Sequence, residues 1–69
     1  MMGKRTMQYK RFLHLFELVR QSDREVDLVR VSDMAVEAWL SNEITTTQLQ
    51  TIEDELDEQM AMLVRHGKI

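Results

Sequence analysis

The side chains with the clearest capacity for chemistry are a histidine and several carboxylates at helical spacing. His14 and Glu17 are three residues apart. Two carboxylate pairs, each four residues apart, follow later in the chain: Glu53 with Asp57, and Asp54 with Glu58. Residues at these spacings share one face of a helix, and carboxylate oxygens are ligands for divalent cations. A solvated helix back explains the same acidic pairs more simply, so we predict no metal site and no cofactor.

Other catalytic arrangements are missing from the sequence. There is no cysteine nucleophile, no glycine-rich phosphate loop, and no serine placed with a histidine and a carboxylate in a known motif. No second histidine lies at ligand spacing from His14, which disfavours zinc. The lack of cysteine also excludes disulfides and thiolate metal sites. We therefore predict that the protein is not an enzyme and has no small-molecule substrate.

Helices must position all of these side chains. The chain has 69 residues, no proline, and two glycines that lie near its ends. A chain rich in helix formers and without internal breakers is typical of an all-α domain. We predict a compact three-helix bundle as a single domain over residues 1–69, completed by dimerisation, with helices near 6–20, 23–41 and 46–66. Residues 1–5 are expected to be loosely ordered.

The middle helix has an apolar surface too broad for one neighbour. At about 100° per residue its apolar side chains cover about 240°, whereas an ordinary surface helix needs a little over 100°. One flank holds Leu28, Val31, Ala35, Ala38 and Trp39, and the other holds Val26, Val29, Val36 and Leu40. We predict that this helix is central and packed on two sides.

The flanking helices carry narrower apolar stripes, and local signals mark the helix ends. On the first helix the stripe consists of Tyr9, Phe12, Leu13, Phe16 and Val19 at helical spacing. The predicted core contains Phe12, Phe16, Val19, Leu28, Val31, Ala35, Trp39, Ile52, Leu56 and Leu63. Capping boxes are predicted at Ser22 with Glu25 and at Thr45 with Gln48, and Gly67 is predicted to end the third helix in a left-handed conformation.

The apolar runs are short, which bears on membranes. None approaches the roughly 20 residues that a membrane-spanning helix needs. The N-terminal segment lacks the continuous apolar core of a secretory signal. We predict a soluble, cytoplasmic protein that does not associate with membranes.

The charge is unevenly distributed along the chain, although the net charge is only −3. Residues 1–22 carry five basic side chains and one acidic one, whereas residues 42–69 carry two basic and six acidic ones. Four of the basic residues are candidates for contacts with nucleic-acid phosphates: Lys4, Arg5, Lys10 and Arg11. The alternative is that the basic first helix lies beside the acidic third helix and offsets its charge. No recognised DNA-binding motif supports the nucleic-acid interpretation.

The favoured hypothesis is a protein-interaction module that acts as a regulator or adaptor. A chain this small buries only about 60% of its unfolded surface, so a broad apolar arc on the middle helix calls for additional cover. A homodimer or another protein would supply it, with two-fold symmetry as the default for a dimer. The candidate interface residues are Trp39, Val29, Val36, Leu40 and Met60. A small nucleic-acid-binding protein that uses the first helix is the alternative.

Overall fold

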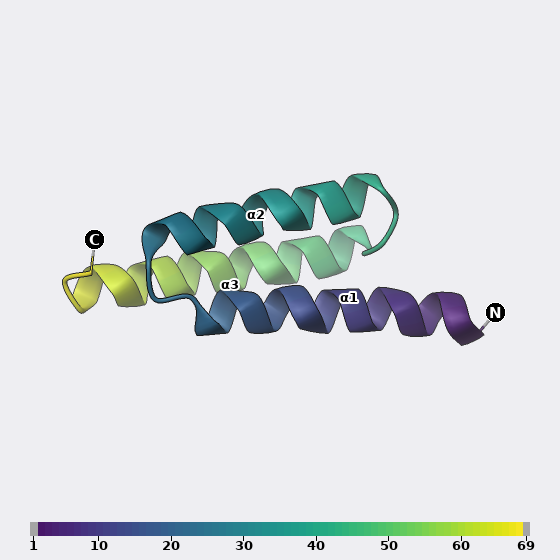
Figure 1. Ribbon diagram of the computed structural model, residues 1–69, viewed down its shortest axis with the longest axis horizontal. Coiled ribbons are helices and arrows are strands. Elements are labelled where there is room, and N and C mark those ends of the chain that lie inside the picture. Colours follow the sequence, from purple (N-terminus) through teal and green to yellow (C-terminus); the bar gives the residue numbers. More distant parts are fainter. Residues whose placement is uncertain (1, 69) are drawn as a thin grey trace.

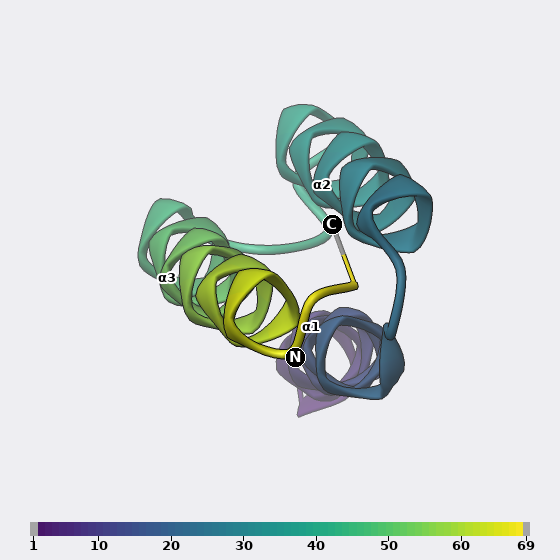
Figure 2. The same ribbon diagram turned by 90° about the vertical axis from the view of Figure 1, so that its left-hand side faces the viewer.

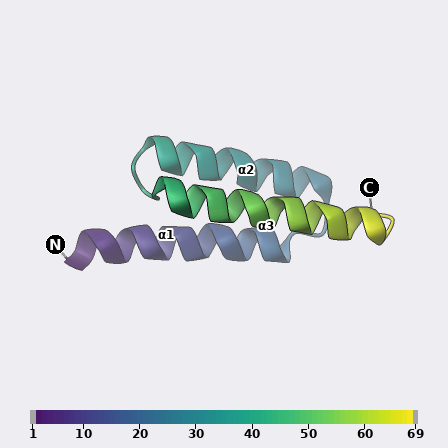
Figure 3. The same cartoon turned by 180° about the vertical axis from the view of Figure 1, so that it is seen from behind.

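The protein is an all-α three-helix bundle (Figure 1). The computed structural model describes the backbone of residues 2–68 and the side chains of residues 9–68. Helix α1 spans Met2–Gln21, α2 spans Glu25–Leu40 and α3 spans Thr46–Arg65. The two connections are short, so α2 runs antiparallel to α1 and α3, which are parallel to each other (Figures 1 and 3).

The three helices lie at the corners of a triangle when the bundle is viewed along its axis (Figure 2). The molecule is elongated, with principal extents of 46 × 17 × 16 Å. The first turns of α1 extend beyond the α2–α3 connection, and the last turns of α3 extend beyond the α1–α2 connection (Figure 1). The first turns of α1 and the last turns of α3 therefore extend past the region where all three helices pack together. The α2–α3 side of the bundle faces away from α1.

The buried core is aliphatic. It consists of Leu15, Val19, Leu28, Val31, Ala35, Ala38, Ile44, Leu49, Ile52 and Leu63. Six of these were predicted from the sequence: Val19, Leu28, Val31, Ala35, Ile52 and Leu63. Phe12 and Leu56 are half-buried and pack against this cluster. Phe16 is also half-buried, with its ring centroid 5.7 Å from that of Phe12.

Two predictions about the core were wrong. Trp39 is exposed rather than buried, because α2 turns Ala38 toward the core and leaves the larger ring at the edge of the helix. On α1 the buried face is centred on Leu15 and Val19, whereas Tyr9 and Leu13 are exposed. The apolar residues of α1 form two overlapping stripes, and contact with both neighbouring helices selects the one that contains Leu15.

Helix α1 begins four residues before its expected start. The sequence placed residues 1–5 outside the helix, but the helix begins at Met2. Most residues in this segment are methionine, lysine and arginine, which are good helix formers, and no proline interrupts them. Residue 1 lies outside the described backbone.

The α1–α2 junction is built around Ser22 in a way that the sequence did not indicate. The predicted capping box of Ser22 with Glu25 is wrong: Arg24 occupies the N-cap position of α2, without a side-chain hydrogen bond. The Ser22 hydroxyl instead donates to the carbonyl of Leu18 at 2.7 Å, and its own carbonyl accepts from Nε2 of Gln59 at 2.9 Å. Ser22 thus ends α1 and ties the junction to α3.

The α2–α3 connection has the predicted cap. The Thr45 hydroxyl accepts from the Gln48 amide at 3.1 Å, and the Gln48 side chain accepts from the Thr45 amide at 2.9 Å, which confirms the capping box. Before it, Asn42 adopts a left-handed conformation with φ of 61°, and the Glu43 amide donates to the Ala38 carbonyl at 2.8 Å. These features form a Schellman end to α2.

Helix α3 ends in the same manner. Gly67 has a φ of 72°, as predicted, and the Lys68 amide donates to the Leu63 carbonyl at 2.9 Å. Within the part of the chain that the structure describes, none of the helices is both long enough and apolar enough to cross a membrane.

The capping box at Thr45 gives a first test of the fold. Thr45→Ala removes the acceptor for the Gln48 amide and should lower the free energy of unfolding by about 1 kcal/mol. Thr47→Ala is the matched control, because that side chain is exposed and alanine is the better helix former. Urea unfolding followed by circular dichroism measures both. Equal losses in the two variants would contradict the role assigned to the cap.

Candidate protein-interaction surface

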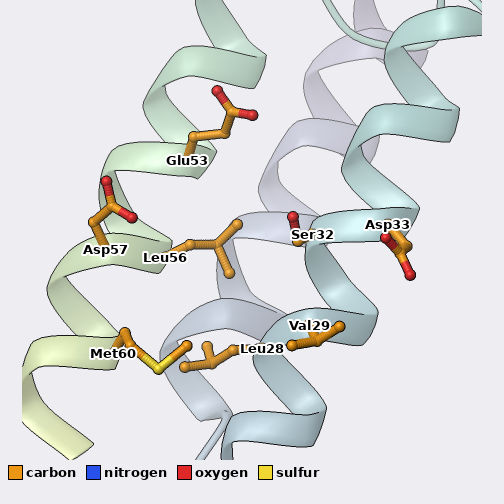
Figure 4. Close-up of a pocket in the computed structure, with 8 residues that line it drawn as sticks. All are labelled: Leu28, Val29, Ser32, Asp33, Glu53, Leu56, Asp57 and Met60. Carbon is orange, nitrogen blue, oxygen red and sulfur yellow. The ribbon is translucent and has the colours of Figure 1, made fainter. Parts of the chain in front are cut away.

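A shallow groove of about 400 Å³ lies between α2 and α3. The side chains that line it are Leu28, Val29, Ser32 and Asp33 from α2, and Glu53, Leu56, Asp57 and Met60 from α3 (Figure 4). Residues 28–33 of α2 lie beside residues 53–60 of α3 at the groove. In Figure 4 the ribbon of α1 lies behind these side chains, so the groove is on the side of the bundle away from α1.

The groove has an apolar floor and acidic rims. Leu28, Leu56 and Met60 point between the two helices, as Figure 4 shows. Asp33 and Asp57 lie on the outer sides of their helices, one on each rim (Figure 4). An apolar floor bounded by charged groups can accept an apolar side chain and orient a charged one beside it.

An exposed apolar stripe on α2 adjoins the groove. It consists of Val26, Val29, Val36 and Leu40, whose side chains all point within about 80° of one another at 100° per residue. Val29 is 52% exposed and Leu40 is 68% exposed. This is the second apolar flank of the middle helix. Helix α2 packs against both α1 and α3, as predicted, but the second flank stays exposed. Three helices cover only one of the two flanks.

Trp39 stands at the end of this surface, beside the start of α3. Its side chain is 37% exposed, and the indole N–H donates to the hydroxyl of Thr46 at 3.0 Å. The hydrogen bond fixes the polar edge of the indole and leaves part of the ring accessible. A tryptophan held in this way can contact a partner without the entropy cost of ordering the side chain.

The structure brings three of the five predicted interface residues, Val29, Met60 and Trp39, to the boundary between α2 and α3, and it leaves Val36 and Leu40 exposed on α2. Val29 and Met60 line the groove, Val36 and Leu40 continue along the exposed stripe, and Trp39 lies near Thr46. Met60 is half-buried and also packs against the core. The sequence indicated Glu53 with Asp57 as an acidic pair but did not place it at this surface. The sequence could have indicated this position, because helical spacing places Glu53 and Asp57 on the same face of α3 as Met60.

The groove carries negative charge without a local counterion. Asp33, Glu53 and Asp57 line it, and it has no basic side chain among the described residues. Within residues 9–68 the ion pairs join Arg11 to Glu43 and Arg24 to Asp27, and none involves a groove carboxylate. The α2–α3 side is thus both apolar and acidic.

The residues first considered for metal binding lie on α1 and α3. Among the described residues there is no cluster of three or more histidine, cysteine, aspartate or glutamate side chains able to hold a metal ion. His14 and Glu17 are both exposed on α1.

The basic residues of α1 are used in different ways. Arg11 is half-buried, and its Nε lies 3.2 Å from Oε1 of Glu43, an ion pair without hydrogen-bond geometry. Lys10 is exposed. The side chains of Lys4 and Arg5 lie outside the described residues. Helix α1 does pack against α3, but its described ion pair reaches the α2–α3 connection rather than the acidic run of α3.

Comparisons with protein-family models, curated proteins and solved structures found no match for this chain.

The pair of Arg11 with Glu43 can be tested by charge reversal. Arg11→Glu should lower the free energy of unfolding by about 1 kcal/mol, because an attractive contact becomes repulsive, and the loss should be larger at low salt. Adding Glu43→Arg to this variant should restore most of the loss. Urea unfolding at low and high salt measures these changes.

Lys10→Glu is the control for this reversal. It introduces the same charge change at an exposed neighbouring position without an ion-pair partner among the described residues. Its stability should stay within about 0.5 kcal/mol of the unmodified protein. A loss equal to that of Arg11→Glu would show that the overall charge of α1, rather than the specific pair, governs stability.

Proposed function

We propose that the protein is a non-enzymatic, cytoplasmic interaction module, a regulator or adaptor that binds another protein through the α2–α3 surface. The observation that carries the proposal is the exposed apolar stripe of α2 beside an apolar groove. Exposed apolar side chains gathered on one helix face beside polar residues, here with Asp33 among them, are a mark of protein-binding sites in soluble proteins.

Helix formation does not account for the composition of the stripe. Valine is a weaker helix former than lysine, glutamate or glutamine because its branched side chain loses rotamer freedom in a helix. Three of the four stripe residues are valines, and all four are exposed. Polar residues there would give a more stable and more soluble helix, so contact with a partner supplies the reason for apolar ones.

Capture from cells of the native source tests this proposal. The full chain should retain a protein partner after nuclease treatment, and the double variant Val36→Glu with Leu40→Glu should lose it. Leu13→Glu with Tyr9→Glu is the matched control, because it places two charges at exposed apolar positions on α1. Circular dichroism should show that both variants remain folded.

Two results would overturn the proposal. Loss of every partner after nuclease treatment would favour the alternative, a nucleic-acid-binding protein that uses the first helix. If the α1 variant loses the partner and the α2 variant keeps it, the interface lies on α1 and not on the α2–α3 surface.

Trp39 is expected to be an anchor of the interface. Trp39→Ala removes the partly exposed ring and should weaken partner binding by more than about 2 kcal/mol, as truncated aromatic anchors do. Thr46→Val, which removes the hydroxyl that accepts the indole N–H, should weaken it less because the ring remains. Titration calorimetry with the captured partner measures both changes. A Trp39→Ala variant with unchanged affinity would exclude the ring from the interface.

A further inference from the structure

We infer that the occupant of the α2–α3 groove is a basic amphipathic helix from a different protein. The inference rests on the proposed function and adds the chemistry of the partner. Three features carry it: the charge of the groove, the shape of its floor, and the charge contacts that a second copy of this chain would create.

The charge of the groove selects a basic occupant. Three carboxylates line it, no basic side chain does among the described residues, and none of the three carboxylates takes part in an ion pair there. An apolar helix flanked by acidic residues would add like charges to this surface and be repelled. A helix flanked by lysine or arginine would place opposite charges at the rims, which favours both encounter and orientation.

The floor of the groove suits the apolar face of a helix. Leu28, Leu56 and Met60 offer aliphatic and thioether surface between two helices, and methionine adapts readily to a partner's side chain. The groove itself is lined by residues 28–33 of α2, and the stripe beside it continues to Leu40, so the groove and the stripe together extend along most of the 16 residues, about 24 Å, of that helix. An occupant of roughly 16 residues, with apolar side chains at helical spacing, would cover it.

A second copy that overlaps the whole stripe opposes like charges. In a two-fold symmetric pairing of α2 helices with this overlap, antiparallel or parallel, the residue at the centre of the stripe faces its own counterpart. The midpoint between Val26 and Leu40 is residue 33, an aspartate that also lines the groove. Such a dimer would juxtapose Asp33 with Asp33 of the second copy, which disfavours it.

Docking α1 of a second copy into the groove avoids that repulsion but gives no closed dimer. Helix α1 lies opposite the α2–α3 side of the bundle (Figure 2), and the groove is lined by α2 and α3 alone. A contact between α1 of one copy and the groove of the next is therefore head-to-tail, and it produces a larger ring or an open chain that leaves one α1 and one groove unoccupied at the ends. A separate protein that carries the basic helix fills the groove without forming an open chain.

A designed peptide tests the inference. The probe is an amidated helical peptide of about 18 residues, with leucines at i, i+3, i+7, i+10 and i+14 and lysines flanking them. It is titrated into the full chain at low and high salt, and its affinity is measured by calorimetry. A second peptide with glutamate in place of every lysine is the comparison.

The lysine peptide should bind at least about tenfold more tightly than the glutamate peptide, and high salt should weaken its binding. Amide resonances of Val29 and Met60 should shift on binding more than those of α1. Neutralising the groove with Asp33→Asn, Glu53→Gln and Asp57→Asn should weaken the lysine peptide at least about fivefold, because three exposed charge contacts are lost.

A matched triple variant controls for net charge. Glu17→Gln, Asp54→Asn and Glu58→Gln remove three exposed acidic charges outside the groove, and affinity should change by less than about twofold. Equal weakening in the two triple variants would show non-specific attraction and overturn the inference. So would equal binding of the two peptides, or peptide-induced shifts confined to α1.

Sedimentation supplies the test for a second copy. The full chain should remain monomeric at low salt, whereas Asp33→Asn should self-associate more strongly because it removes the repulsion at the two-fold axis. A stable dimer of the unmodified chain that the lysine peptide cannot displace would overturn the inference.

If the peptide fails to bind but the Val36→Glu, Leu40→Glu variant loses its cellular partner, the inference fails and the proposed function stands. If the peptide binds the groove but the Val36→Glu, Leu40→Glu variant keeps its cellular partner, the proposed function is contradicted.

Discussion

The packing of α2 against both other helices is the constraint on which the rest of the structure depends. Its buried residues are Leu28, Val31, Ala35 and Ala38. Two of the four are alanines, and small side chains at a contact allow helix axes to approach closely. The fully buried positions of the described chain hold no aromatic residue, so the phenylalanines lie at the edge of the core. A core so narrow covers only one flank of α2, and the second flank is left to solvent.

Much of the fold follows from local features of the sequence. The lack of proline and of internal glycine predicts long helices, and the Thr45–Gln48 box and Gly67 mark real helix ends. These features depend on residues within one turn of each other, so neighbouring sequence contains the whole interaction. The two flanks of α2 also follow from periodicity alone. Helical spacing is sufficient to identify Val29, Val36 and Leu40 as candidate interface residues, because it depends on α2 and not on how its neighbours pack.

The features that the sequence could not supply depend on distant partners. The Ser22 hydroxyl bonds to the carbonyl of Leu18, but the backbone carbonyl of Ser22 accepts from the side chain of Gln59, 37 residues away, which the local sequence does not indicate. On α1, stripes centred on Phe16 and on Leu15 are both apolar, and only the positions of two neighbouring helices select between them. The sequence identifies Glu53 and Asp57 as an acidic pair, but only the position of α2 beside them makes them line a groove.

The position of the stripe would couple the proposed partner binding to folding. Helix α2 contributes four residues to the core and also carries the exposed stripe, so a partner that covers the stripe holds in place the helix that joins α1 and α3. A core in a chain of this size supplies about 3–5 kcal/mol of stability. A partner present at about 100 times its dissociation constant adds about 2.7 kcal/mol if it binds the folded state alone. Binding of this strength would be comparable to the stability of the bundle itself, so it would protect the chain from unfolding and from proteolysis.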